Sequence, residues 1–291
     1  MFFSDDSSAR TDVANVRTGY LDLGFVRKGT KTVLGRRLYS YPFSVSRVFY
    51  VDTAPLGMAS VILQTASGTL NAGDRLLERL HAGAMSSAHV TTQGAASVHR
   101  SPAGMETVER VELVADEGSL LEYMPELRIL FPDSRFSQTT TLQLGARSIA
   151  IMCDGFVVYD PAHAGRPLRS YIVETKILSA EGRLLATEAA HLDRLPAMTG
   201  RRASFRAFGT LFVAVFLESR ARDGLIEAIE CAMSSQSELY WSVSALPNQC
   251  GVSLRIAGPD GGRLRAGVRT GWLTARKHLF GSLPGMLHKA G

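Results

Sequence analysis

The chain has 291 residues, 45% of them hydrophobic and 20% charged, with a mild formal net charge of +5, values typical of a soluble globular protein with a sizeable core. Its longest strongly apolar run, residues 211–217, is far shorter than the roughly 20 residues of a membrane-spanning helix, which argues against a helical membrane span. The opening MFFSDDSSAR carries acids where an export signal needs a basic start, so the sequence predicts a cytoplasmic protein.

Short strands separated by glycine, serine and proline dominate the first 220 residues. Apolar and polar side chains alternate with a period of two, the pattern of a half-buried strand, at 108–114, 139–144 and 149–153. Turn-forming sequences separate such runs, at 68–74, 116–118 and 258–262. This regular spacing predicts a mainly β fold, a sandwich-like or coiled β-sheet scaffold, rather than alternating βαβ units.

Helical patterns are confined to the last third of the chain, where about two short helices are expected. The first begins at Asp223, a good N-cap residue, and is followed by apolar residues at helical spacing. The second covers residues 271–280. Without a low-complexity linker or an internal repeat, the sequence predicts one domain over residues 1–291, with 1–16 disordered and 154–169 forming a long loop.

Residues 255–291 form a basic C-terminal segment, with seven lysines and arginines against a single acid, Asp260. Such a segment can contact nucleic acid or an acidic protein surface, and the simpler interpretation is a solvated tail. Its only large aromatic residues are Trp272 and Phe280, which is few for stacking on bases.

The common catalytic and metal-binding motifs are absent from the sequence. It contains no G-x-x-x-x-G-K-[ST] loop, no G-x-G-x-x-G after a strand, no G-x-S-x-G elbow and no H-E-x-x-H. None of the seven histidines lies at ligand spacing from another histidine or a cysteine, and the three cysteines are widely separated, as expected of free thiols in a reducing compartment. No catalytic residue, dedicated tight metal site or permanently bound cofactor is therefore expected.

Residues 91–100, TTQGAASVHR, combine hydroxyls, an amide, an imidazole and a guanidinium. A strand here puts His89, Thr91 and Gln93 on one face, without a nucleophile beside an oriented base. Gly94 indicates a bulge or a close approach of another backbone. The stretch is an exposed or structural strand face, or a partner or ligand surface, and catalysis is the weakest of the three interpretations.

Glu122 lies among apolar residues in Ser119-Leu-Leu-Glu-Tyr-Met-Pro125. A buried carboxylate costs several kcal/mol unless it is paired, so it needs a cation or a polar channel. Arg100 and Arg128 are candidate partners. The sequence leaves open whether Glu122 belongs to a structural ion pair or is a functional carboxylate.

Four segments occur in a particular order: 19–25 (GYLDLGF), 68–74 (GTLNAGD), 91–100 and 118–125 (GSLLEYMP). Together they resemble the urease accessory protein D family, called UreD or UreH. The combination T-T-x-x-A-x-x-x-x-R followed by G-x-x-L-E-x-x-P is specific, whereas either piece alone is weak. The resemblance is good from about residue 19 to 145. The chain departs from the family pattern at Ser97 and His99, in residues 154–174 and at the C-terminus.

The resemblance implies a non-enzymatic urease-maturation scaffold that helps deliver nickel into apo-urease. Family members are β-rich proteins that bind the helical accessory protein UreF, which recruits the GTPase UreG, and the assembly docks on apo-urease; a homodimer within that complex is left open. The GTPase supplies the nucleotide chemistry, in agreement with the missing phosphate-binding loop. Nickel is bound transiently, along a water-filled passage lined by polar groups.

For the nickel passage or partner surface, the resemblance points to six residues: Asp74, Thr91, Gln93, Glu122, Asp154 and Glu174. Oxygen and nitrogen ligands of this kind can replace the hydration of a divalent cation and still release it. Structural support is expected from Gly73, Gly94, Arg100 and Pro125, with Arg100 holding a carboxylate in place.

Two other hypotheses compete with the urease-maturation scaffold. One is a basic module that binds nucleic acid or an acidic protein surface through residues 255–291. The other is a β-fold hydrolase using His89 or His99, which rests on the presence of those side chains alone.

Overall fold

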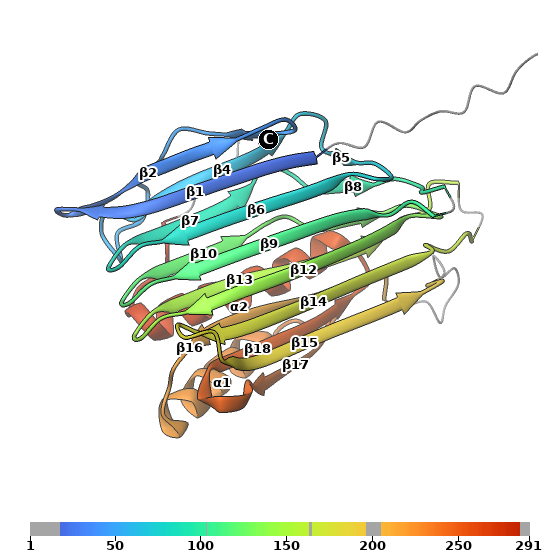
Figure 1. Ribbon diagram of the computed structural model, residues 1–291. Helices are drawn as coiled ribbons and strands as arrows, with labels where there is room; N and C mark the ends of the chain where they lie inside the picture. The colour runs from blue at the N-terminus through green and yellow to red at the C-terminus, as the bar shows by residue number, and fades with distance from the viewer. Residues whose placement is uncertain (1–17, 103, 163–164, 196–204, 286–291) are drawn as a thin grey trace, which may run out of the picture.

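Two β-sheets packed face to face, with two helices on the outside, make up the protein (Figure 1). The computed structural model describes residues 18–102, 104–162, 165–195 and 205–285. The disorder expected for residues 1–16 lies outside the described residues.

The strands divide into a seven-stranded and an eleven-stranded sheet. In spatial order the first contains β15 (Leu184–Asp193), β14 (Ser170–Ser179), β12 (Arg135–Leu144), β9 (Thr107–Ala115), β6 (Arg75–Ala82), β1 (Thr18–Lys28) and β2 (Lys31–Tyr39). The main path of the second contains β17 (Tyr240–Ala245), β18 (Gly251–Gly258), β16 (Ala207–Val215), β13 (Ile149–Val158), β10 (Leu120–Met124), β7 (Ser87–Thr92), β4 (Ala59–Thr65) and β3 (Phe43–Val45). Beside that path lie β5 (Thr69–Leu70), β8 (Ala96–Val98) and β11 (Arg128–Leu130).

The chain winds as a coil through its central part. Strands β6, β9, β12 and β14 pair in parallel within one sheet, and β4, β7, β10 and β13 pair in parallel within the other. Because consecutive long strands alternate between the sheets, each turn of the coil adds one strand to each layer (Figure 1). The prediction of a mainly β, coiled-sheet scaffold with two helices near the C-terminus is confirmed.

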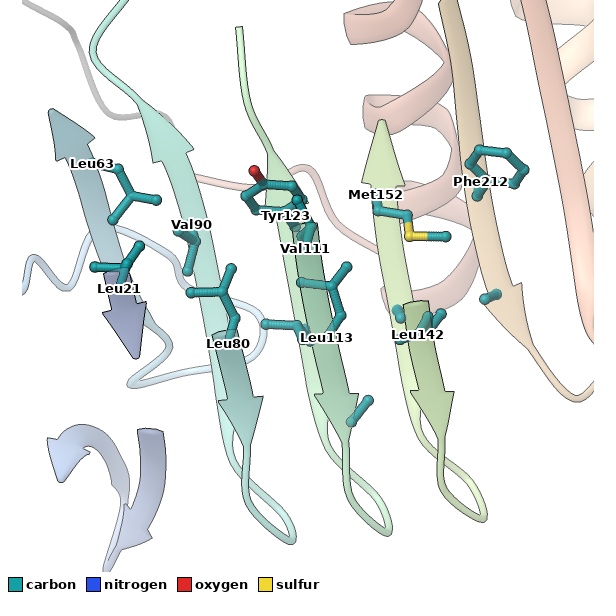
Figure 2. Close-up of a cluster of buried hydrophobic side chains, with 14 of the residues drawn as sticks. Leu21, Leu63, Leu80, Val90, Val111, Leu113, Tyr123, Leu142, Met152 and Phe212 are labelled. Carbon is teal, nitrogen blue, oxygen red and sulfur yellow. The ribbon is translucent and has the colours of Figure 1, made fainter. Parts of the chain in front are cut away.

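The main hydrophobic core fills the space between the sheets, as Figure 2 shows for Leu80 and Leu113 from one sheet and Val90 and Met152 from the other. The period-two pattern of β9 is confirmed, because Leu113 and its alternate neighbours are buried while the intervening residues are less so. Strand β13 is buried on both faces, and its Ile151 belongs to a second core beneath the helices. Burial of both faces fits a central strand in a three-layer arrangement.

The helices α1 (Ser219–Met233) and α2 (Gly261–Phe280) cover the outer face of the eleven-stranded sheet. The expected start at Asp223 is wrong, because α1 begins at Ser219 after the extended Glu218. The expected start of the second helix is also wrong. Helix α2 begins ten residues earlier, where the Asp260 carboxylate accepts a hydrogen bond from the Arg263 backbone. The described residues contain no helix that is long and apolar enough to cross a membrane.

The expected long loop from residue 154 is shorter than the sequence suggested. Strand β13 continues to Val158, so Asp154 belongs to a strand rather than to the loop. The strand continues because Asp154 and its neighbours pair in register with β16, with Asp154 opposite Thr210. Because Asp154 lies in a strand, the alternation of side chains along β13 fixes the face of the sheet to which it points.

Candidate functional site

A row of polar side chains crosses the inner face of the seven-stranded sheet. Glu78 lies in register with Val111, Thr140, Thr175 and Glu188 on successive strands. Only Val111 is apolar in this row. Glu109 and Gln138 are paired in the neighbouring row, and Gln138 donates to Thr140 over 3.0 Å. The core between the sheets therefore contains a polar band rather than uninterrupted apolar packing.

The eleven-stranded sheet contributes partners to one end of this band. Tyr123 of β10 donates its hydroxyl hydrogen to Glu78 over 2.9 Å. Arg128 of β11 donates from Nε and a terminal nitrogen to Glu109, at 3.1 and 2.6 Å. All four side chains are buried, so Arg128 is the cation that compensates two carboxyl groups inside the protein.

At the other end of the band, two strands bring the acids Asp154 and Glu188 close together. Asp154 is on the same face of β13 as Met152 and Phe156, which pack between the sheets. Glu188 of β15 accepts hydrogen bonds from the Thr210 hydroxyl at 3.1 Å and from Arg255 at 2.7 Å. Because Arg255 is 57% exposed, this end of the band reaches the surface.

A cavity lies at each end of the polar band. The first, of about 410 Å³, is lined by Glu78, Glu109 and Arg128 together with Thr92 and Gln93. The second, of about 300 Å³, is lined by Asp154, Thr175, Glu188, Thr210 and Arg255, among apolar residues. Thr175 and Glu188 of the second cavity share the register row that begins at Glu78 in the first.

Two acids of the band, Glu78 and Asp154, have raised pKa values. Burial, reinforced by the charge of Glu109, raises the pKa of Glu78 to about 7. Burial, reinforced by the charge of Glu188, raises the pKa of Asp154 to about 7, and the Arg128 charge opposes this. Arg128 lines the first cavity, and its charge lowers the pKa of Asp154 in the second cavity. The two ends of the band are therefore electrostatically coupled.

Glu122 belongs to a different cluster, on the helix side of the eleven-stranded sheet. It is fully buried and pairs at 2.7 Å with Arg276 of α2, and His89 Nδ1 lies 2.7 Å from its other oxygen. Arg276 also pairs with Asp52 at 2.8 Å. Burial alone would raise the pKa of Glu122, but the hydrogen bond from His89 and the Arg276 charge lower it below its usual value.

The cation partners expected for Glu122 are therefore wrong. Arg128 pairs with Glu109 on the other side of the sheet, and Arg100 is exposed, with no carboxylate partner in the described ranges. Arg276, 154 positions away in the sequence, fills the role. The local sequence carries no signal for a partner so far along the chain.

The structure separates the six residues expected at one site. Gln93 and Asp154 line the two cavities, whereas Thr91 donates to the Met124 carbonyl at 2.7 Å on the helix side of the sheet. Asp74 is buried in the turn before β6, where it accepts a hydrogen bond from the Asn71 backbone at 2.8 Å. Glu174 faces outward on β14 and pairs with Lys176 at 2.8 Å.

The expected supporting residues occupy ordinary structural positions. Gly73 has a φ of 86°, in the left-handed region that favours glycine. Gly94 is exposed and lines the first cavity, with no atom close to where a Cβ would lie. The Pro125 carbonyl lies 3.7 Å from the Cys153 sulfur.

The basic C-terminal segment is not a solvated tail. Within the described ranges it forms the end of β18 and the whole of α2, and Lys289 lies outside them. Most of its guanidinium groups are paired: Arg255 with Glu188, Arg263 with Glu238, Arg265 with Glu126, and Arg276 with Glu122 and Asp52. These pairs leave little free positive charge for a nucleic acid.

Sequence reasoning missed Glu78, Glu109 and Glu188, although the first two carry a readable signal. Glu78 is in phase with Leu76 and Leu80, and Glu109 is in phase with the buried residues of β9. An acid in the apolar phase of a strand points into the core. In the described part of the chain, no three histidine, cysteine or acidic residues are grouped closely enough to hold a metal ion.

The coiled pair of sheets makes the protein a β-rich scaffold. Residues 17–286 match the family model described as UreD urease accessory protein. The chain belongs to this family, and it is a urease accessory protein.

Its relatives cover nearly the whole chain. It is 38% identical over 252 residues to urease accessory protein UreD 2 of Bradyrhizobium sp. (strain ORS 278), a match covering 85% of each chain. It is 33% identical over 280 residues to urease accessory protein UreD 1 of Pseudomonas syringae pv. syringae (strain B728a), covering 94% of this chain and 95% of the relative. Urease accessory protein UreD of Mycolicibacterium smegmatis is 35% identical over 248 residues, covering 85% of this chain and 87% of the relative.

Proposed function

We propose that this protein is a non-enzymatic scaffold that helps deliver nickel into apo-urease, and that the cation moves along the polar band between the two sheets. The observation that carries the proposal is the register row that begins at Glu78, which lines the cavity at one end of the band, and ends at Glu188, which lines the cavity at the other.

The chemistry of the band suits a divalent cation that must enter and leave. Carboxylate, hydroxyl and amide oxygens can replace lost water ligands, and none of the described groups forms a closed site that would retain the ion. Glu78 and Asp154, with pKa values of about 7, can each release a proton as the cation approaches, so the positive charge of the interior changes little.

Arg128 balances the negative charge of the carboxyl groups at the first cavity. It holds Glu109 by two hydrogen bonds, and without it two carboxyl groups would lie buried with no cation nearby. A nickel ion passing the first cavity competes with Arg128 for Glu109. This arrangement favours brief rather than tight binding at that point.

Partner proteins supply the nucleotide-binding function for which this chain has no motif. With no nucleotide motif of its own, this protein acts with UreF-type and UreG-type accessory proteins, and the GTPase provides the nucleotide chemistry. The complex docks on apo-urease in the cytoplasm, and one cavity of the band faces the point where nickel enters apo-urease. Nickel is cargo here and not a resident cofactor.

Co-expression of urease subunits with the other accessory proteins, with and without this chain, tests the proposed function. The nickel content of purified urease and its activity should both fall when the chain is omitted. Affinity capture from the same cells should recover the UreF-type and UreG-type partners. Urease that is equally loaded with nickel in the absence of the chain would contradict the proposal.

A further inference from the structure

A separate hollow at the surface is surrounded by arginines from three turns of the coil. Its volume is about 480 Å³, and its lining consists of Arg100, Ser101, Pro102, Asp133, Arg135 and Arg169. These residues lie in the segments that precede β9, β12 and β14, or at the start of β12. None of them lines either cavity of the polar band.

Positive charge exceeds negative charge in this hollow. Asp133 is its only acid among the lining residues, and it pairs with Arg169 at 2.8 Å and with the nearby Arg166 at 3.7 Å. In the part of the chain that the structure describes, neither Arg100 nor Arg135 has a carboxylate partner. Two guanidinium groups are thus left without a counter-ion of their own.

Arg135 also carries an unused donor. Its Nε is buried and has no hydrogen-bond partner among the described residues. A buried donor without a partner destabilises the protein, and an anion beside it would offset that loss. The Ser101 hydroxyl, which accepts from the Arg135 backbone at 3.3 Å, keeps its own hydrogen for another acceptor.

Backbone hydrogen bonds hold the walls of the hollow together. Ser101 donates to the Asp133 carbonyl at 3.0 Å, and Asp133 donates to the Pro167 carbonyl at 2.9 Å. Arg169 donates to the Ser134 carbonyl at 2.9 Å. The three segments that supply the arginines are therefore fixed relative to one another, which lowers the entropic cost of binding a ligand.

We propose that this hollow binds an oxyanion, a phosphate or carboxylate group, through Arg100 and Arg135, with Arg169 shared between the ligand and Asp133. Guanidinium groups present planar pairs of donors that match the oxygens of both anions, and such charge-assisted hydrogen bonds are stronger than neutral ones. The hollow shares no lining residue with either cavity of the polar band, so the proposed anion site is separate from the proposed nickel route.

Titration of the full chain with inorganic phosphate and, separately, with the dicarboxylate glutarate tests the proposal. Isothermal calorimetry gives the affinity, and the arginine Nε–H resonances in a proton–nitrogen spectrum show whether Arg135 responds. We expect saturable binding of at least one probe, with Arg135 among the resonances that shift. The tighter probe then identifies the class of oxyanion.

Three variants localise the binding. Arg100→Gln and Arg135→Gln should each weaken it about tenfold to a hundredfold, the loss of one charge-assisted contact. Arg220→Gln, at an exposed arginine on α1, is the matched control and should bind as the wild type does. Absence of saturable binding of both probes by the wild type would overturn the proposal. Unchanged affinity in folded Arg100→Gln and Arg135→Gln proteins would overturn it equally, and the Arg135 resonance of the wild type decides the matter if a variant does not fold.

Discussion

Arg276 in the last turns of α2 donates a 2.7 Å hydrogen bond to Glu122 on β10, and both side chains are fully buried. The same guanidinium pairs with Asp52 at 2.8 Å, so one side chain links the C-terminal helix, the central sheet and the segment before β4. Glu122 is held on the helix side of the sheet, away from the polar band.

Removing Arg276 should destabilise the protein severely. Arg276→Ala leaves Glu122 and Asp52 buried without their cation, and we expect the free energy of unfolding to fall by about 3–5 kcal/mol. Arg265→Ala is the control, because Arg265 is 59% exposed and its pair with Glu126 should contribute less than about 1 kcal/mol. Urea unfolding of the two variants measures both values, and similar losses would contradict the account.

Glu78 should make stability depend on pH. The unfolded carboxyl loses its proton near 4.5, but the folded one only near 7, so the folded state binds more protons between these values. Stability therefore falls as pH rises from about 4.5 to 7, by about 3 kcal/mol for this group. Glu78→Gln should remove that fall and be more stable than the wild type at pH 8.

Glu174→Gln, on the outer face of the same sheet, is the control for this measurement. Its denaturant midpoint should follow the wild type from pH 4 to 8. A Glu78→Gln protein whose stability changes with pH as steeply as the wild type would show that another group carries the effect.

The sequence predicted the strands well and the site only in part, for identifiable reasons. Alternation in β9 and β12 depends on neighbouring residues alone, so it could be read directly. The partner of Glu122 could not, because Arg276 reaches it through the packing of α2 on the sheet. Glu174 was expected at the passage, yet strand parity turns it outward, and the inward acid of the adjacent strand is Glu188.

Close approach of α2 to the sheet depends on small residues. A Cβ at Gly271 would lie 2.5 Å from the Leu254 side chain and 2.9 Å from that of Leu211. Gly271→Val should lower the free energy of unfolding by about 1–3 kcal/mol through overpacking. Ala266→Val, at an exposed position of the same helix, should lower it by less, since only helix propensity changes. Thermal unfolding compares the two, and a smaller loss for Gly271→Val would contradict this packing.

The basic C-terminal segment should bind polyanions weakly. Arg263 and Arg265 are already paired with Glu238 and Glu126, so they offer little charge to heparin or DNA. The double variant Arg263→Gln with Arg265→Gln should leave the salt concentration of elution from heparin nearly unchanged. A steep drop in that concentration would revive the hypothesis of a nucleic-acid or acidic-surface module.

The central claim is that nickel passes between the sheets. It is tested most directly by comparing variants of acids that point between the sheets with a variant of an acid that points outward. Asp154→Asn with Glu188→Gln removes two carboxyl groups from the second cavity, whereas Glu174→Gln removes one carboxyl group from the outer face of β14. Each variant is co-expressed with urease and the other accessory proteins. The nickel content of purified urease is then measured, together with capture of the partner proteins.

We predict that the Asp154→Asn, Glu188→Gln protein still folds and captures its partners, and that urease matured with it contains severalfold less nickel. Urease matured with the Glu174→Gln protein should be fully loaded. Normal nickel content with the double variant, or an equal loss with Glu174→Gln, would contradict passage of nickel along the band between the sheets.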